Sequence, residues 1–420
     1  MKIQKLRNTV MLILLSLVPV LNIGEISGFV RGDMQAAFWF TTPLYIKLIK
    51  DIGFLLIILL SMPLLFEMDK KKRNIVILFL SALSVFTALL FFISYKNNPV
   101  QALAGLRWMT PLFLTTIMVG TIDDDLITQI AKVIAVVFLI SVALQLYEIF
   151  NVKPLPGYCV NSQAHEFFKL KPWPGSFVNL QALLKYVVSR PWVGGVFVLY
   201  NTTGFFTCVT MFLAYFYIKR GALRIITLIL VPLSLLLARS GTGMPVYILS
   251  NFLIWAKGKF SIIKLFLFFV VALLIISPIS FMRGHDIIKY FKPRVWAQAE
   301  SALKETGMIS REFGKGTNAM VLYNQKFKTE SKGLILDSTI AATIVNTGLA
   351  GLIIVVFLYA IWLIFVILSG RPDAMIFTFI YSLFALTASV MEAFPMNLIF
   401  AVGVAYFAPI IFLQRDKIKA

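Results

Sequence analysis

The sequence predicts an all-α, polytopic integral membrane protein with about twelve transmembrane helices in a single domain, residues 1–420. Hydrophobic residues make up 59% of the chain, charged residues only 14%, and the mean hydropathy is +0.87. A soluble domain would carry about 25% charged residues. The apolar stretches lack the alternation of strands, and lipid offers no partners for unpaired backbone groups. We therefore expect helices.

Each expected helix is an apolar stretch that approaches the roughly 20 residues needed to cross a bilayer. In chain order, these stretches are 9–23, 45–66, 75–94, 102–120, 129–149, 203–218, 225–238, 243–256, 262–281, 344–368, 373–390 and 397–413. Two long loops interrupt the series, residues 151–202 and 282–336.

Basic residues set the expected orientation, because Lys and Arg are enriched in cytoplasmic turns. The basic clusters are Lys2, Lys5 and Arg7; Lys70, Lys71, Lys72 and Arg73; Lys219, Arg220 and Arg224; Lys257, Lys259 and Lys264; and Arg415, Lys417 and Lys419. With about twelve spans, all of them lie on the cytoplasmic face together with both termini. The acidic turn at Asp123, Asp124 and Asp125 disagrees, but acidic residues contribute little to this rule.

Both long loops are then expected on the outer side of the membrane. The first, residues 151–202, combines prolines with apolar residues at helical spacing, which favours a short helix on the membrane surface. The second, residues 282–336, carries an outward-facing excess of bases that includes Arg283, Lys292, Arg294 and Arg311. Long loops are usually functional or disordered. Anchoring at the membrane interface is the alternative explanation for these bases.

Charged residues also occur within the expected spans, where ionisable groups indicate function. Lys47, Lys50 and Asp51 open the second span, and Lys47 and Asp51 are spaced to pair. Snorkelling is the alternative for the lysines. Arg107 lies early in the fourth span, after apolar residues.

The segment from Arg224 to Lys257 has bases at both ends, so we expect a hairpin with its apex at residues 238–243, Ala-Arg-Ser-Gly-Thr-Gly. Each arm of about 14 residues rises about 21 Å, less than the bilayer core of about 30 Å. Arg239 is therefore expected beneath the outer surface. A Gly-rich turn beside an Arg presents N–H groups to an anion; a polar turn with Arg239 snorkelling outward is the alternative.

These arginines together predict a site for a membrane-embedded anion, with Arg239, Arg107, Arg283 and Arg294 converging in the outer leaflet. Guanidinium groups bind phosphate through paired hydrogen bonds, so a lipid-linked diphosphate is the expected ligand. The net charge of +20 otherwise suits anionic lipid headgroups. We expect no nucleic-acid partner. Neither the two cysteines nor any nucleotide-binding or zinc motif indicates a metal or other cofactor.

Several short motifs resemble the carboxy-terminal half of the bacterial O-antigen polymerase and O-antigen ligase family over roughly residues 225–370. They are Phe291-Lys292-Pro293-Arg294-Val295-Trp296, then Phe313-Gly314-Lys315-Gly316-Thr317-Asn318, then Asp337-Ser338, and then Asn346-Thr347-Gly348-Leu349-Ala350-Gly351-Leu352. The turn at residues 238–243 resembles a Ser/Arg-rich turn upstream in the same family.

The resemblance implies a GT-C-like helical glycosyltransferase architecture with two long periplasmic loops, acting on undecaprenyl-diphosphate glycans in the bacterial inner membrane. By carry-over, Arg294 and Arg239 bind the donor diphosphate. The further expected substrate-binding residues are Arg107, Arg283, Arg311, Lys292, Gly314, Gly316 and Ser240. Asp337-Ser338 stands where the ligase branch has a His-Asn pair, which favours the polymerase branch.

Asp337 is the expected general base, at a junction between a loop and a helix; a helix N-cap is the alternative role. His165 and His285 are weaker candidates. The expected function is that of a polymerase that joins lipid-linked oligosaccharide repeats. A protein that regulates chain length would be a further partner compatible with this function. The alternatives are the ligase that moves polymer onto lipid A and a flippase for the same lipid-linked units, although the chain shows no transporter-like repeat.

Overall fold

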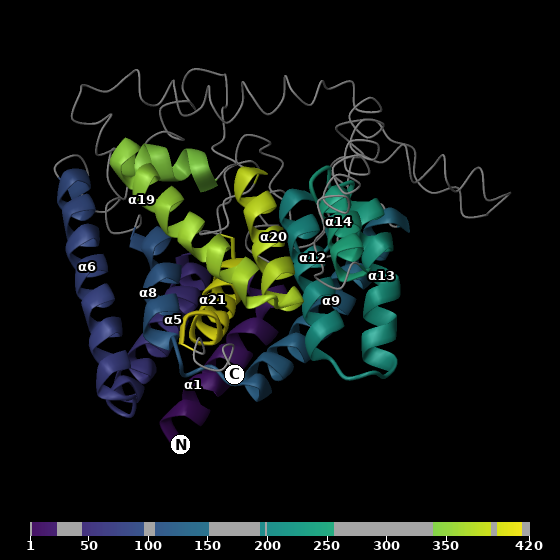
Figure 1. The fold of residues 1–420 in the computed structure, drawn as a ribbon. Helices are drawn as coiled ribbons and strands as arrows, with labels where there is room; N and C mark the ends of the chain where they lie inside the picture. The colour runs from purple at the N-terminus through teal and green to yellow at the C-terminus, as the bar shows by residue number, and fades with distance from the viewer. Residues whose placement is uncertain are drawn as a thin grey trace, which may run out of the picture.

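The computed structural model describes residues 2–22, 44–95, 106–150, 194–197, 200–255, 339–387 and 393–413. All regular secondary structure in these ranges is helical (Figure 1). The helices are α1 (Lys2–Ser16), α2 (Val18–Leu21), α5 (Leu44–Phe66), α6 (Lys70–Tyr95), η1 (Leu106–Met109), α8 (Thr110–Met118), α9 (Asp124–Phe150), α12 (Tyr200–Tyr217), α13 (Ala222–Ala238), α14 (Gly243–Trp255), α19 (Thr339–Ser369), α20 (Pro372–Thr387) and α21 (Met396–Leu413).

Among the helices in the described ranges, four are long and apolar enough to cross a membrane, and several shorter ones are also apolar. The four long segments are Leu48–Phe66, Lys70–Ile93, Asp124–Tyr147 and Asn346–Ser369. The described part of the chain is thus all-helical, as predicted, and has the character of a multi-pass membrane protein. The predicted span 262–281, the loop 282–336 and most of the loop 151–202 lie outside the described residues.

Three predicted spans differ from continuous helices. The stretch 9–23 is divided between α1 and α2 at Leu17. The stretch 102–120 contains the 3₁₀ turn η1 followed by the nine-residue helix α8. Pro111 stands in the first turn of α8. Its missing N–H is tolerated at that position, but a proline there prevents an earlier helix from continuing into α8. The stretch 344–368 is broken at Gly348, whose φ of 68° and ψ of −166° lie outside the helical region.

One end of the bundle gathers the start of α1 and the turns that join α5 to α6, α8 to α9, α12 to α13, and α19 to α20 (Figure 1). We call it the basal end and the opposite end the apical end. Arg7 donates hydrogen bonds to Oγ1 of Thr121 at 2.6 Å and to its carbonyl at 2.8 Å. Tyr217 donates to Asp373 at 3.1 Å, and its ring lies 6.0 Å from that of Tyr406.

Charge is concentrated at this basal end. Its bases in the described ranges include Lys2, Lys5, Arg7, Lys70, Lys71, Lys72, Arg73, Lys219, Arg220, Arg224 and Arg371. Burial lowers the pKa of Arg7 to about 10, with Asp123 opposing the shift, so this guanidinium stays charged at neutral pH. A hydrogen bond to Asp373 raises the pKa of Arg371. The described basic clusters therefore share one end, as the sequence predicts.

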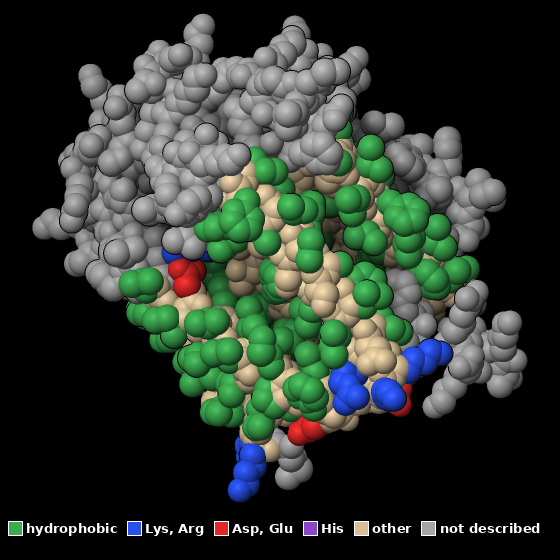
Figure 2. All heavy atoms as spheres, turned by 90° about the vertical axis from the view of Figure 1, so that its left-hand side faces the viewer, with side chains coloured by type: hydrophobic (Ala, Val, Ile, Leu, Met, Phe, Trp, Pro, Cys, Tyr) green, Lys and Arg blue, Asp and Glu red, His purple; other side chains and the backbone are tan. Residues whose placement is uncertain are grey.

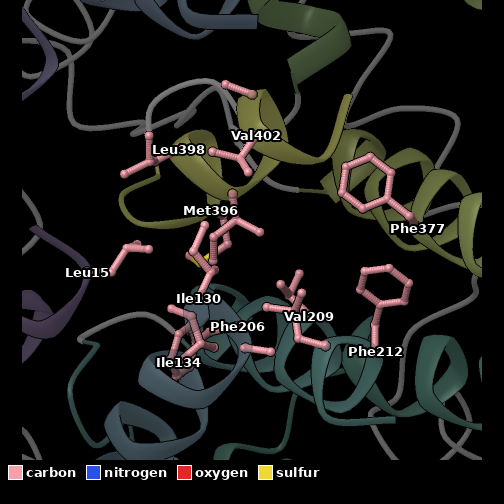
Figure 3. Close-up of a cluster of buried hydrophobic side chains, with 14 of the residues drawn as sticks. Leu15, Ile130, Ile134, Phe206, Val209, Phe212, Phe377, Met396, Leu398 and Val402 are labelled. Atoms are coloured by element: carbon pink, nitrogen blue, oxygen red, sulfur yellow. The ribbon is translucent and has the colours of Figure 1, made fainter. Parts of the chain in front are cut away.

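Helix α12 lies at the centre of the core, where it packs against α9, α13, α14 and α20. Phe206, Val209 and Phe212 are buried on it and face the same cluster as Phe377 (Figure 3). In lipid, helices associate through close packing rather than a hydrophobic driving force, so small residues are favoured where helices meet. Gly403 is such a residue, because a Cβ there would lie only 2.4 Å from the Phe377 ring.

The outer surface is apolar on the side formed by α6. Leu78 on α6 is 70% exposed, and Phe357 on α19 is 64% exposed. Figure 2 shows a broad hydrophobic face on the α6 side, bordered below by charged side chains. This arrangement of an apolar belt above a charged end suits contact with a lipid bilayer.

Candidate functional site

The predicted hairpin apex is present at the apical end of α13. Helix α13 ends at Ala238, and Arg239 adopts the left-handed conformation with φ of 50° and ψ of 38°. Glycine normally occupies such a position, because a Cβ is unfavourable there. Among the described residues, Arg239 is the one non-glycine residue with positive φ. Strained backbone of this kind is concentrated at functional sites.

Ser240 fixes the shape of the turn from inside. Its side chain is buried, and its Oγ accepts a hydrogen bond from the backbone N–H of Gly243 at 3.0 Å. Its carbonyl accepts from the N–H of Met244 at 3.2 Å. Ser240 thus satisfies N–H groups of the first turn of α14 in the manner of an N-cap.

The amino-terminal part of α12 packs directly onto this turn. Gly204 approaches Ser240 so closely that a Cβ at position 204 would lie 2.0 Å from the Ser240 Oγ and 3.5 Å from the Cα of Gly243. The amino-terminal ends of α12 and α14 therefore meet at Ser240. Each such end carries partial positive charge, although the N–H groups in the first turn of α14 are already bonded to Ser240 and Thr242. Arg239 directly precedes Ser240 in the chain.

A short buried segment supports the start of α12. Residues 194–197 are buried between α9 and α12. Thr203 donates to the carbonyl of Gly194 at 2.9 Å, and the N–H of Val196 donates to Ser141 at 3.2 Å. Gly195 has a φ of 63°, and a Cβ there would lie 2.4 Å from the carbonyl of Ser141, so this position requires glycine. The start of α12 is thereby held against α9.

A second apical feature is the break in α19. Gly348 has a φ of 68°, which favours glycine, and it divides α19 into two helices. Gly351 makes room for Thr347, because a Cβ at position 351 would lie 1.9 Å from its Oγ1. The spacing of the two glycines in the Asn346–Leu352 motif therefore has a packing explanation. Residues 349–369 extend about 31 Å along their helix axis, and Figure 1 shows α19 running obliquely from its basal turn to the apical side.

Arg107 is held by a carboxylate. Its Nε donates to Oδ2 of Asp51 at 2.9 Å, and its Nη2 donates to the same oxygen. The side chains are 44% and 35% exposed. The sequence spacing favours a pair between Asp51 and Lys47, whose side chain lies outside the described set; the structure pairs Asp51 with Arg107. Lys50 approaches Asn22 at 3.4 Å and the ring of Phe394 at 5.5 Å.

Arg239 and Ser240 lie in the same turn, whereas Arg107 lies in a different part of the bundle. Helix α13 packs against α12, α9 and α14, whereas η1 and α8 pack against α5, α6 and α21. Figure 1 places α8 and α13 on opposite flanks of the bundle. The other predicted site residues lie outside the described ranges: Asp337, Arg294, Arg283, Arg311, Lys292, Gly314 and Gly316.

Sequence reasoning missed Gly204 and gave Asn346 no role. No pattern marks Gly204, because its importance comes from the approach of another helix. Within the described ranges, no group of three or more His, Cys, Asp or Glu side chains is placed to hold a metal. Comparison with protein-family models and with curated proteins gives no match for this chain.

Proposed function

We propose that this protein is a glycosyltransferase of the O-antigen polymerase type. It joins undecaprenyl-diphosphate-linked oligosaccharide repeats at the periplasmic face of the bacterial inner membrane. In this proposal the basal end with its bases and both termini faces the cytoplasm, and the apical end faces the periplasm. The sequence motifs quoted above and the multi-pass helical fold support the assignment.

The observation that carries the proposal is the strained Arg239 beside two helix starts. A left-handed arginine is unfavourable for the fold, whereas an arginine that directly precedes Ser240, where the positive ends of α12 and α14 meet, adds positive charge that favours an anion. This turn is at the end opposite the basal bases, so the positive-inside rule does not explain its charge. A diphosphate on a lipid at that face has the matching charge.

The chemistry follows from this placement. The oxygen of an acceptor hydroxyl attacks the anomeric carbon of the donor sugar, the bond from that carbon to the diphosphate oxygen breaks, and the diphosphate leaves with the electron pair. Arg239 stabilises the growing negative charge, as preorganised cations do. Asp337 is proposed to accept the hydroxyl proton, from the sequence argument alone.

The α19 break also bears on the flippase alternative. Transporters place broken helices near the middle of the membrane. Figure 1 shows α19 running obliquely from its basal turn with α20 to the apical side, so the Gly348 break in its amino-terminal part lies toward the apical end of the bundle rather than at its middle. That position favours chemistry at one face over alternating access.

The test is elongation of lipid-linked repeats by protein in lipid nanodiscs, without nucleotide sugar or metal. Arg239→Gly removes the guanidinium and relieves the backbone, so we expect loss of elongation with unfolding temperature kept or raised. Arg220→Ala, at the exposed basal end, is the matched control and should retain elongation. The proposal is wrong if the wild-type protein leaves only single repeats, or if Arg239→Gly elongates normally.

A further inference from the structure

Asn346 is a buried polar residue that the fold leaves unsatisfied. Its side chain is 0% exposed, and neither Nδ2 nor Oδ1 has a hydrogen-bond partner among the residues that the structure describes. Buried polar groups are almost always paired, and an unpaired donor or acceptor is unfavourable. A carboxamide with both ends unpaired therefore indicates a partner that is not part of these helices.

The surroundings of Asn346 add to this indication. Asn346 precedes the break at Gly348 by two residues, so it stands beside the first turn of the second half of α19, where a helix has unpaired N–H groups. The neighbouring hydroxyls are already engaged: Thr343 donates to the carbonyl of Thr339 at 2.8 Å, and Thr347 donates to that of Thr343 at 2.6 Å. No charged residue occurs in α19.

The two free atoms of Asn346 decide the class of ligand. Nδ2 donates and Oδ1 accepts, so the complementary group must accept and donate as well. A phosphate at neutral pH mainly accepts and would leave Oδ1 unpaired. Two neighbouring hydroxyl groups of a sugar satisfy both atoms. We propose that Asn346, at the Gly348 break, binds the saccharide part of the lipid-linked substrate through a pair of hydroxyl groups.

This inference rests on the proposed polymerase function and divides its substrate between two places. Helix α20 packs against α19 on one side and α14 on the other, and Figure 1 shows it between them. The neutral α19 break takes sugar hydroxyls, and the Arg239 turn across α20 takes the diphosphate. Because the carboxamide is buried, the saccharide reaches it when α19 and its neighbours separate locally.

The test compares Asn346→Leu with wild type. Replacing an unpaired buried amide by an apolar side chain of similar shape is neutral or stabilising for folding. We therefore expect an unchanged or higher unfolding temperature, together with a rise of about tenfold or more in the acceptor concentration that gives half-maximal elongation, from the loss of two hydrogen bonds. Asn251→Leu is the matched control, because Asn251 is exposed and its Nδ2 is already bonded to the carbonyl of Tyr247 at 2.8 Å.

A second readout does not need elongation. Free oligosaccharide, released from the lipid diphosphate by mild acid, should raise the unfolding temperature of wild type and of Asn251→Leu but not of Asn346→Leu. A lower unfolding temperature for Asn346→Leu alone would show that the amide is paired within the fold, and an unchanged response to saccharide would show that it holds only water; either result overturns the inference. Wild-type protein that binds saccharide without elongating it would refute the proposed function but keep the sugar site.

Discussion

The contact between Gly204 and Ser240 allows the geometry of the candidate site to be tested by packing alone. In Gly204→Ala, the new Cβ would lie 2.0 Å from the Ser240 Oγ and 2.4 Å from its Cβ. Real Cβ contacts do not fall below 3.0 Å, so α12 and the Arg239 turn must separate by about 1 Å. The substitution therefore disturbs the junction on which Arg239 depends without touching the arginine.

The expected cost is the difference of two opposing effects. Overpacking a close contact costs about 1–3 kcal/mol, and alanine recovers up to about 1 kcal/mol of helix propensity relative to glycine. With the full propensity gain, Gly204→Ala should therefore destabilise the protein by up to about 2 kcal/mol. Ser240→Gly removes both clashing atoms and leaves the Gly243 Cα at 3.5 Å, an ordinary contact. Ser240→Ala removes only the Oγ and leaves the Cβ clash.

Thermal unfolding in nanodiscs measures this difference through a double-mutant cycle. Ser240→Gly alone loses the acceptor for the Gly243 N–H but should cost only about a few tenths of a kcal/mol, because glycine is also tolerated at an N-cap. Combined with Gly204→Ala, it should give a favourable coupling of about 1–3 kcal/mol, and elongation should recover in parallel. The matched double variant combines Gly204→Ala with Ser240→Ala and should stay destabilised. Equal stability of the two double variants would refute the proposed packing of α12 on the turn.

Three further substitutions test other parts of the structure. Gly348→Ala forces a side chain into a region reserved for glycine and should destabilise the protein by about 1–3 kcal/mol; an unchanged unfolding temperature would contradict the break in α19. Asp51→Asn weakens an ion pair that is partly exposed, so thermal stability should change by less than about 1 kcal/mol, and a large loss would mean that the pair is more enclosed than described. Arg7→Met removes the two hydrogen bonds that Arg7 donates to Thr121 and should lower the free energy of unfolding by about 1–3 kcal/mol. Chymotrypsin should then cut the native protein faster near the basal turns. An unchanged digestion rate would argue against a stabilising role for these two hydrogen bonds.

Much of the fold could be predicted, because the length and composition of apolar stretches determine which segments become membrane helices. The hairpin at residues 238–243 was also predictable, since bases at both ends of a short apolar segment require a turn between them. The broken span at Gly348 was not predicted, because hydropathy is insensitive to backbone conformation. A glycine two residues after a polar Asn inside an apolar run was the available signal.

The site was predictable only in part. The sequence correctly indicated a turn at Arg239, but the lateral order of helices in a bundle is set by packing and not by position along the chain. For this reason Arg107, which the sequence grouped with Arg239, lies on the other flank and pairs with Asp51. Gly204 carries no local signal, because its neighbour Ser240 comes from another helix.

The loose attachment of α6 has a consequence for how this chain can diverge. Its long apolar segment packs mainly on α8 and η1, and most of its large side chains face outward. Selection at those positions acts on the hydrophobicity of the side chains and the length of the apolar segment rather than on side-chain shape. Leucine, isoleucine, valine and phenylalanine are therefore interchangeable there. Among related proteins, the amino-acid sequence should therefore diverge fastest along α6. The sequence of α12, which is enclosed by other helices on several sides, should change slowly and retain similarity between distant relatives.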